Sequence, residues 1–326
     1  LRRIVASGRP LVWTLHDMRA FTGGCHYSAG CAGFTAGCTG CPQLEPALSP
    51  VASRGLSRSR RRLHGVPLTF VTPSRWLAEE LVRSSLFDPE AHGVRVIPNG
   101  IDLARFRSSD RAAARARLGL QADGLGILLG SVSLAEQRKG GEAAVAAIGQ
   151  MAAELAANPI VGPPPIVITY GSGALELPGI ASRHLGPVDE AGVLEAIHAS
   201  DVHLTLARED NLPNTVMEAM ACGVPVVAAR AGGLPEMIVD EVSGWLVDVD
   251  APGQAASVLK RLARDPALTR TAGRQARRQA EAEWASDLQA RRYLALAAEL
   301  AASCSVRDPL PPAQGSGCDR PAALTP

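Results

Sequence analysis

The sequence has almost no net charge, few aromatic residues and no long apolar run. Its 33 Lys and Arg residues against 32 Asp and Glu residues give a formal net charge of +1, so no overall field attracts nucleic acid or anionic lipid. Only 4% of residues are aromatic, which leaves few rings for nucleobases to stack on. Apolar runs such as residues 224–229 are far shorter than the roughly 20 residues of a membrane-spanning helix. We therefore expect a soluble protein without nucleic-acid partners.

Strand-like runs alternate along the 326 residues with amphipathic helical stretches. The predicted strands are residues 11–15, 68–72, 94–97, 126–132, 166–170, 202–206 and 224–228. The predicted helices are residues 75–84, 142–157, 190–198, 214–222 and 253–264. This alternation predicts an α/β fold of parallel sheets with helices on both faces, and a chain with 46% apolar residues is long enough for two such cores.

The domain boundary is predicted near Pro98, because this residue and the Asn99–Gly100 pair follow a predicted strand. We place one doubly wound domain at residues 1–98 and a second at residues 99–283. Residues 303–326 contain many Pro and Gly residues and few apolar ones, and burial there cannot offset the entropy lost on ordering. A disordered tail is therefore expected.

The most informative stretch, residues 210–227, is predicted to form an acidic loop, a helix and a strand. It follows the predicted strand at residues 202–206, and open α/β sheets bind ligands beyond the carboxyl ends of their strands. The unpaired amides and the dipole of the new helix favour phosphate. Asp210 and Glu218 flank the helix start, and carboxylates accept hydrogen bonds from sugar hydroxyls. The alternative for these acids is a pair of surface charges without a role in binding.

With seven residues between them, Asp210 and Glu218 resemble the two acids of the EX7E motif of retaining GT-B glycosyltransferases of family 4. The likeness continues into residues 232–236 and 244–247, in the usual order of the family. The resemblance implies a GT-B fold of two Rossmann-like domains, the first of them incomplete at its start. It also implies a crossover helix at residues 284–302.

The resemblance assigns roles at the sugar end of the donor. It implies that Glu218 binds the ribose hydroxyls, while Asp210 and the amides of Asn211 and Leu212 face the transferred sugar. Asp210 is one methylene shorter than the Glu usual in this position. The neighbouring Glu209 is therefore an alternative ligand for the sugar.

The diphosphate end of the donor needs positive charge, because negative charge develops there as the sugar leaves. The resemblance implies that Thr215 and Val216 contact the diphosphate, and Lys139–Gly140 resembles the Lys-Gly pair that the family has at the donor phosphates. The family's Arg five residues before that Lys is replaced by Leu134. We expect Arg138 to take over its role, with a solvent-exposed Arg138 as the alternative.

The predicted strand at residues 11–15 ends at His16–Asp17, again at a ligand-binding edge. Residues 14–18 and 20–27 resemble a subgroup of the same family found in exopolysaccharide and colanic-acid-type pathways. This resemblance places His16 beside the donor sugar as a catalytic residue with Asp210 and Glu218. A lone His is otherwise most often structural.

The resemblance implies a retaining enzyme that moves a hexose from a UDP- or GDP-sugar to a glycan or lipid-linked acceptor in polysaccharide biosynthesis. No catalytic metal or cofactor is implied, because the departing phosphate assists deprotonation of the acceptor and positioning supplies most of the rate. The family has a further half domain before the position of Leu1. A non-catalytic remnant that still binds nucleotide is therefore one alternative, and a sugar-nucleotide epimerase is another, since fold does not fix reaction.

Four of the seven cysteines lie in one short stretch with the spacing C-x5-C-x6-C-x2-C, namely Cys25, Cys31, Cys38 and Cys41. The final C-x2-C pair can form one corner of a tetrahedral thiolate site, for which zinc is the first choice. An iron–sulfur cluster, reduced structural thiols and two disulfides are the alternatives. A closed all-cysteine zinc site would pin a loop and take no part in the transfer. Such a local cluster favours a reducing cytoplasm.

A basic cluster could dock the protein on an anionic membrane surface or on a lipid-diphosphate acceptor. It consists of Arg54, Arg58, Arg60, Arg61, Arg62 and His64. A solvated helix or loop face is the preferred interpretation, because no stripe of aromatic residues accompanies these charges. We expect a cytoplasmic protein, with peripheral contact at the inner face of the membrane as an option. A metal-centred interaction or nucleic-acid module ranks last.

Overall fold

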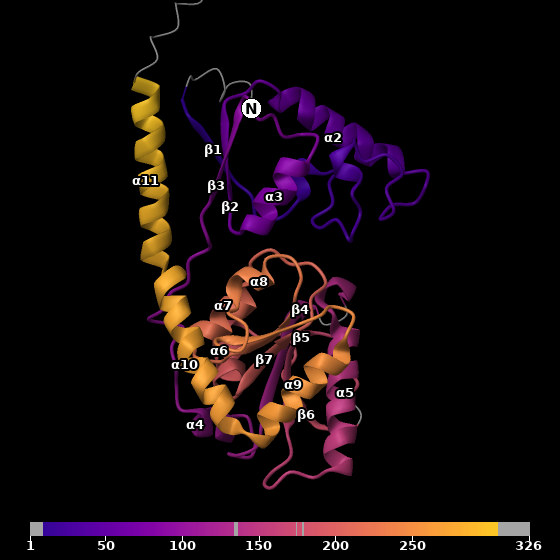
Figure 1. Cartoon of the computed structure of the whole chain (residues 1–326), viewed down its shortest axis with the longest axis vertical. Coiled ribbons are helices and arrows are strands. Elements are labelled where there is room, and N and C mark those ends of the chain that lie inside the picture. The colour runs from indigo at the N-terminus through magenta and orange to yellow at the C-terminus, as the bar shows by residue number, and fades with distance from the viewer. Residues whose placement is uncertain (1–8, 134–135, 174, 178, 306–326) are drawn as a thin grey trace, which may run out of the picture.

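The computed structural model describes residues 9–133, 136–173, 175–177 and 179–305, which form two α/β domains and a long last helix (Figure 1). The first domain holds a parallel sheet in the order β1-β2-β3. Its strands are β1 (Leu11–Thr14), β2 (Leu68–Thr72) and β3 (His92–Val96). Its helical elements are η1 (Arg19–Phe21), η2 (Gly33–Thr35), α2 (Ser49–Leu63) and α3 (Arg75–Arg83).

Helix α3 shows how local sequence builds the first core. The side chain of Ser74 accepts a hydrogen bond from the amide of Leu77, as expected for a capping residue. Leu77 and Leu81, four residues apart on one helix face, are fully buried in the cluster that contains Phe70 of β2. The helix is thereby fixed over the sheet.

The second domain holds a six-stranded parallel sheet in the order β6-β5-β4-β7-β8-β9. Its strands are β4 (Gly126–Ser133), β5 (Ile166–Ser172), β6 (Ala181–His184), β7 (Val202–Thr205), β8 (Val226–Ala229) and β9 (Gly244–Val247). Its helices are α4 (Arg111–Arg117), η3 (Gln137–Lys139), α5 (Gly141–Ala157), α6 (Glu190–His198), α7 (Asn214–Ala221), α8 (Leu234–Met237), α9 (Pro252–Arg264) and α10 (Pro266–Glu283). The predicted α/β class with parallel sheets is confirmed.

Side chains on the two faces of this sheet enter two separate cores. Leu128 of β4 packs in one buried cluster, whereas its neighbours Ile127 and Leu129 pack in the other. Strands that are buried on both faces need continuous apolar sequence, which is why the predicted runs were easy to find. Strand β6 is an exposed edge strand without such a run, and the sequence did not reveal it.

The strand order places a crevice beside β4. Strand β5, which follows β4 in the chain, pairs with one edge of β4, and β7 pairs with its other edge. The strand order therefore reverses its direction at β4. Ligands of open α/β folds bind beyond the carboxyl ends of the strands at such a switch point. The carboxyl ends of β4 and β7 lead to η3 and to the loop before α7.

Helix α11 (Ser286–Ser305) follows α10 and runs back along the first domain (Figure 1). Leu296 of α11 packs on Val71 and Ile97, and the hydroxyl of Tyr293 lies 2.9 Å from Oγ1 of Thr14. This helix extends into the stretch for which disorder was predicted, a correction for residues 303–305. The rest of that stretch, like residues 1–8, lies outside the described part of the chain. None of the described helices is long and apolar enough to cross a membrane.

Candidate donor site

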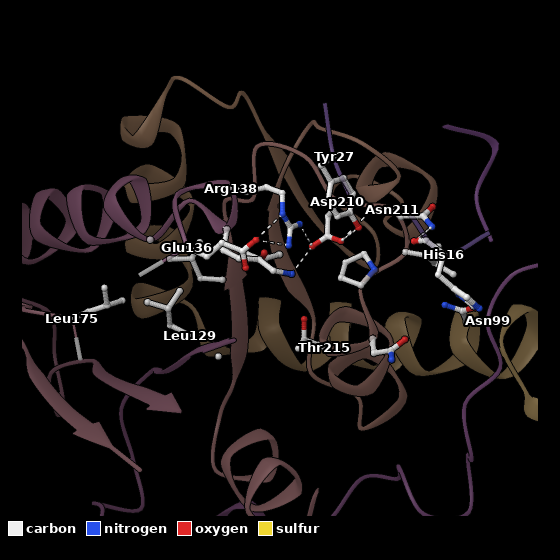
Figure 2. Close-up of a pocket in the computed structure, with 18 residues that line it drawn as sticks. His16, Tyr27, Asn99, Leu129, Glu136, Arg138, Leu175, Asp210, Asn211 and Thr215 are labelled. Carbon is white, nitrogen blue, oxygen red and sulfur yellow. Dashed lines mark hydrogen bonds and ion pairs between the residues drawn. The ribbon is translucent and has the colours of Figure 1, made fainter. Parts of the chain in front are cut away.

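A cavity of about 540 Å³ opens where the two domains meet, beyond the carboxyl ends of β4 and β7. The first domain contributes His16 and Tyr27 to its lining, and the second contributes η3, the loop before α7 and the first turn of α7. Figure 2 shows Tyr27, Arg138 and Asp210 pointing toward one another in its centre. The predicted site residues that line it are His16, Arg138, Lys139, Asp210, Asn211, Leu212 and Thr215.

Asp210 is buried and bound on several sides. Its carboxylate accepts hydrogen bonds from Nζ of Lys139 at 2.7 Å and from the hydroxyl of Tyr27 at 3.2 Å. The amide of Asn211 also donates to it, and Nη1 of Arg138 lies 3.4 Å away. Burial and the charge of Asp210 raise the pKa of Tyr27, so its phenol stays protonated and donates. The acid therefore sits in a set of donors that balances its charge.

Arg138 is held inside the cavity and is largely shielded from solvent. Its guanidinium lies 4.2 Å from the centroid of the Tyr27 ring, and Nη1 donates to the backbone carbonyl of Glu209 at 2.8 Å. Its side chain is 22% exposed and also contacts Glu136. The solvent-exposed alternative is therefore wrong, while the phosphate role stays a prediction. The equivalent position of the family's Arg, Leu134, lies outside the described residues.

Lys139 reaches the cavity because of the glycine that follows it. Gly140 has φ +71°, and a Cβ there would lie 1.8 Å from the carbonyl oxygen of Leu206. Only glycine permits both this conformation and this approach, so η3 can press against the end of β7. The amide of Arg208 then donates to the carbonyl of Arg138 at 2.8 Å and joins the two loops.

Glu209 is not available to a sugar in this structure, which corrects the expectation that it could replace Asp210. Its carboxylate accepts hydrogen bonds from the amide of Ser28 at 3.1 Å, from Oγ of Ser28 at 2.9 Å and from the amide of Ala29 at 2.8 Å. Its side chain is buried and points away from the cavity into the first domain. Adjacent acids thus have different partners.

Asn211 also joins the two domains. Its side-chain oxygen accepts from Oγ of Ser74 at 2.5 Å, and its side-chain nitrogen donates to the carbonyl of His16 at 3.0 Å. The imidazole of His16 is exposed at the wall of the cavity. His16 therefore contributes its backbone to the domain contact and leaves its ring free for a ligand.

Two predicted donor residues do not line the cavity. Val216 is fully buried, and its amide donates to the carbonyl of Pro213 at 3.1 Å. Glu218 lies farther along α7, partly buried near Tyr170, and burial raises its pKa, as does the charge of Glu190 to a smaller extent. Asn214 and Thr215, the first two residues of α7, do line the cavity.

Sequence reasoning missed several lining residues, of which Tyr27 makes the most contacts. Its ring stacks with that of Trp76 at a centroid distance of 6.3 Å, and Cζ of Arg138 lies 4.2 Å from its centroid. Asn99, Glu136 and Asn214 also line the cavity. A signal for Tyr27 was present, since it ends the stretch that resembles the exopolysaccharide subgroup, but nothing in that pattern indicated a partner 183 positions away.

The four clustered cysteines line a second cavity of about 320 Å³ in the first domain. Cys25, Cys31, Cys38 and Cys41 are free thiols there. Burial raises the pKa of Cys25 and of Cys38, and the charges of the other clustered cysteines raise both further. Among the described residues, no three His, Cys, Asp or Glu side chains already surround a common metal position.

The basic cluster lies on helix α2 and just after its end. Its six side chains are exposed, while Ala52, Leu56 and Leu63 form the buried face of the helix. The exposed apolar residues Leu48 and Val51 lie at the start of the same helix. The solvated helix face expected from the sequence is thus present, with a small apolar end.

Known proteins resemble both the second domain and the fold as a whole. A model of the family "Glycosyl transferases group 1" matches residues 176–279. The chain is 35% identical over 220 residues to D-inositol 3-phosphate glycosyltransferase of Streptomyces avermitilis, covering 63% of this chain and 46% of the relative. The protein of the same name from Saccharomonospora viridis is 35% identical over 219 residues, which cover 63% of this chain and 49% of that relative. The chain thus spans about half the length of the curated relatives it matches.

Solved structures extend the likeness across both domains. Sucrose-phosphate synthase from Thermosynechococcus elongatus superposes with a TM-score of 0.65 at 22% identity, over 90% of this chain and 68% of that one. Anabaena Alr3699/HepE in complex with UDP-glucose superposes with a TM-score of 0.63 at 19% identity, over 94% of this chain and 77% of that one. These neighbours are GT-B glycosyltransferases. The chain therefore has a GT-B-type fold, and its residues 176–279 match the model of glycosyl transferases group 1.

Proposed function

We propose that this chain transfers a hexose from a UDP- or GDP-sugar to an acceptor hydroxyl with retention at the anomeric carbon. The observation that carries the proposal is the cavity between the domains, where Lys139 and Arg138 stand beside Asp210 at the start of α7. Cations and helix amides are the groups that neutralise a leaving diphosphate, and a carboxylate binds sugar hydroxyls. The group 1 domain and the relatives' names support the same reaction class.

The phosphates would bind at Lys139, Arg138 and the amides of Asn214 and Thr215. In the free protein Lys139 is paired with Asp210. A bound diphosphate would compete for the ammonium, and the freed carboxylate of Asp210 would accept hydrogen bonds from the hexose. Donor binding therefore exchanges one ion pair for two contacts without leaving a buried charge unpaired.

The chemistry needs no group beyond these. The bond between the anomeric carbon and the phosphate oxygen breaks, and the acceptor oxygen forms the new bond on the same face of the sugar. The acceptor proton passes to the oxygen of the departing diphosphate. The contribution of Lys139 and Arg138 is to stabilise the negative charge that grows on that oxygen. His16, whose ring is exposed at the wall, would border the sugar.

Glu218 would bind the two ribose hydroxyls of the donor. It lies on α7 beyond the residues that line the cavity, next to Tyr170. Burial raises its pKa, and hydroxyl groups that donate to the carboxylate would lower it again because they favour the charged form. Nucleotide binding should therefore be tighter at neutral pH than in acid, where Glu218 is protonated.

The acceptor would be a phosphate-bearing glycan or lipid-linked glycan of polysaccharide biosynthesis. The exposed arginines of α2 belong to the domain opposite the donor half and offer charge to such a group. They also suit peripheral contact with the inner face of the membrane, with Leu48 and Val51 entering its interface. The relatives are named for D-inositol 3-phosphate, another phosphate-bearing acceptor.

The first experiment measures the affinity of the chain for UDP, GDP, ADP and their hexose conjugates by titration calorimetry. We expect one nucleotide to bind, and Glu218→Ala to weaken it by about 10- to 100-fold because a charge-assisted hydrogen bond is lost. Glu299→Ala, which removes an exposed carboxylate of α11, is the matched control and should change nothing.

A second measurement separates transfer from binding alone. Release of nucleotide and a new glycoside, with the anomeric configuration of the donor by NMR, would support the retaining transferase. Binding without turnover would favour the nucleotide-binding remnant, and conversion of the donor to an epimer without acceptor would favour an epimerase. No nucleotide binding by the folded protein would overturn all three.

A further inference from the structure

The segment of residues 25–43, called the cysteine loop below, connects the small cysteine cavity to the donor cavity. It runs between η1 and α2 and contains only the short turn η2. All four of its cysteines line the small cavity together with Phe34. A connection of this length without regular structure needs other contacts to hold it in place.

Two residues with left-handed backbone conformation shape the loop near its last two cysteines. Cys38 has φ +58°, a conformation that non-glycine residues rarely adopt, and Gly40 within the C-x2-C pair has φ +65°. Sγ of Cys31 accepts a hydrogen bond from the amide of Gly33 at 3.3 Å.

We propose that Cys25, Cys31, Cys38 and Cys41 together bind one zinc ion. Four sulfur ligands on one cavity match the tetrahedral all-thiolate sites that zinc forms, and no open coordination position is left for catalysis. No three potential ligands of the described residues surround a metal position beforehand, so the ion must draw the sulfurs inward. Zinc fits better than an iron–sulfur cluster because sugar transfer moves no electrons.

The zinc ion would position the part of the cysteine loop that touches the donor loop, an inference that rests on the proposed function. Tyr27 follows Cys25 by two residues and donates to Asp210, while the next residue, Ser28, donates to Glu209. At the other end, Nε2 of Gln43 donates to the carbonyls of Tyr27 and Ser28, each at 2.9 Å. The ion would thus hold both ends of the cysteine loop, through Cys25 near Tyr27 and through Cys41 near Gln43.

The decisive experiment is metal analysis of the full chain purified without added metal or chelator. We expect about one zinc per chain, in line with a single closed site. Cys38→Ser and Cys41→Ser should each lose the zinc, and Cys222→Ser, which removes a buried cysteine of the second domain, should keep it. A protein with neither zinc nor iron, or with fewer than seven thiols reactive to a thiol reagent after unfolding, would overturn the proposal, because the chain has seven cysteines.

Cobalt keeps the test valid if the serine variants do not fold. The metal-free wild-type protein should bind one Co²⁺ and develop the visible absorption of a tetrahedral thiolate complex, which zinc then displaces. Absence of that spectrum in folded protein would refute the zinc site, and the visible absorption of an iron–sulfur cluster after purification would replace it with another metal group.

The positioning role has a separate readout. Removing zinc should weaken nucleotide-sugar binding by about 10-fold, since the hydrogen bond from Tyr27 to buried Asp210 would become mobile. Binding of the free nucleotide should change less, because Asp210 faces the sugar. If zinc is present but its removal leaves sugar-dependent affinity unchanged, the positioning role fails while the proposed transferase stands. If the zinc-loaded protein binds no nucleotide, the proposed function fails instead.

Discussion

The two sides of the donor cavity are built on different principles. On the second-domain side, strand ends and helix starts place the residues, and glycine contacts leave no freedom of position, as at Gly140. On the first-domain side, the cysteine loop supplies Tyr27 through a few hydrogen bonds and a ring stack. One wall follows from the sheet itself, and the other depends on side-chain contacts.

The difference has a consequence for stability and motion. A wall made from the ends of buried strands can open only when the domain unfolds, whereas a loop held by hydrogen bonds can open by itself. On the second-domain side, called the rigid wall below, Glu209 and Asp210 bind the cysteine loop, and Asn211 binds Ser74 of the first domain. The acidic loop therefore makes many of the cross-domain hydrogen bonds, and Glu236 of α8 accepts two more from the amides of Arg75 and Trp76.

Substitutions in the rigid wall should reduce the free energy of unfolding the most. In Gly140→Ala, the new Cβ would lie 1.8 Å from the carbonyl oxygen of Leu206, in a left-handed conformation. Two backbone segments would have to separate, so we expect a loss of about 4 kcal/mol or more in the free energy of unfolding. Urea denaturation of the purified variant measures this loss.

The control for that variant is Gly149→Ala in helix α5. There an added Cβ meets no atom within 4 Å, and replacing a helical glycine by alanine should stabilise by roughly 0.5 to 1 kcal/mol. Equal effects of the two substitutions would mean that the close contact between η3 and β7 does not exist.

Lowering the pH should reduce the free energy of unfolding through His203 of β7, which lies in the second domain. Burial lowers the pKa of His203 to about 4, and the charge of Lys139 lowers it as well. Between pH 6.5 and 4 the unfolded chain therefore takes up a proton that the folded one does not. The free energy of unfolding should fall over this window by roughly 3 kcal/mol, with no contribution from this group above pH 6.5.

Two buried histidines allow this prediction to be checked across the two domains. Nε2 of His203 has no hydrogen-bond partner among the described residues, and Nδ1 lies 3.3 Å from the carbonyl oxygen of Leu128. His203→Phe or His203→Leu should therefore reduce the pH dependence and lose only this one long hydrogen bond near neutral pH. In the first domain both ring nitrogens of His92 are paired, with the amide of Asp88 and the carbonyl of Leu63, so His92→Phe should destabilise at every pH. An unchanged pH profile in the His203 variants would refute the assignment.

The rigid wall is also the part that the sequence predicted well. Its strands follow from apolar runs that are buried on both faces, whereas Lys139–Gly140 was assigned from the resemblance to the family. The positions of Asp210 and Lys139 at one strand edge needed only the order of the elements. Edge strand β6 was missed because its exposed side chains leave no such pattern.

The contacts across the cavity could not be predicted in this way. Nothing in the residues themselves tells that Glu209 turns toward Ser28 while Asp210 turns toward Lys139, because that choice depends on a loop more than 150 positions away. Val216 shows the opposite limit, since the family pattern assigned it to the phosphates although its amide is used within the first turn of α7. Side-chain contacts between the two domains depend on how their surfaces fit together in the folded protein, which local sequence patterns do not describe.

The contact between the two walls should give the smallest of these effects on stability. Glu209→Gln keeps the shape of the side chain but turns an NH2 group toward the donors of Ser28 and Ala29. We expect a loss of about 2 kcal/mol, which corresponds to roughly 30-fold faster amide exchange at these two residues if the loop opens locally. Hydrogen exchange followed by mass spectrometry should show this change in the cysteine loop and leave strand β7 protected.

Glu136→Gln provides the comparison, because this acid lies at the same cavity but is 44% exposed and should have almost no effect. Exchange that rises equally in β7 and in the cysteine loop would mean that both walls open together, and the distinction between them would be lost. If Glu209→Gln lowered sugar-nucleotide affinity as much as Asp210→Asn does, Glu209 would have to be a ligand of the sugar after all. Only local exchange with preserved affinity agrees with an acid that serves the loop and not the donor.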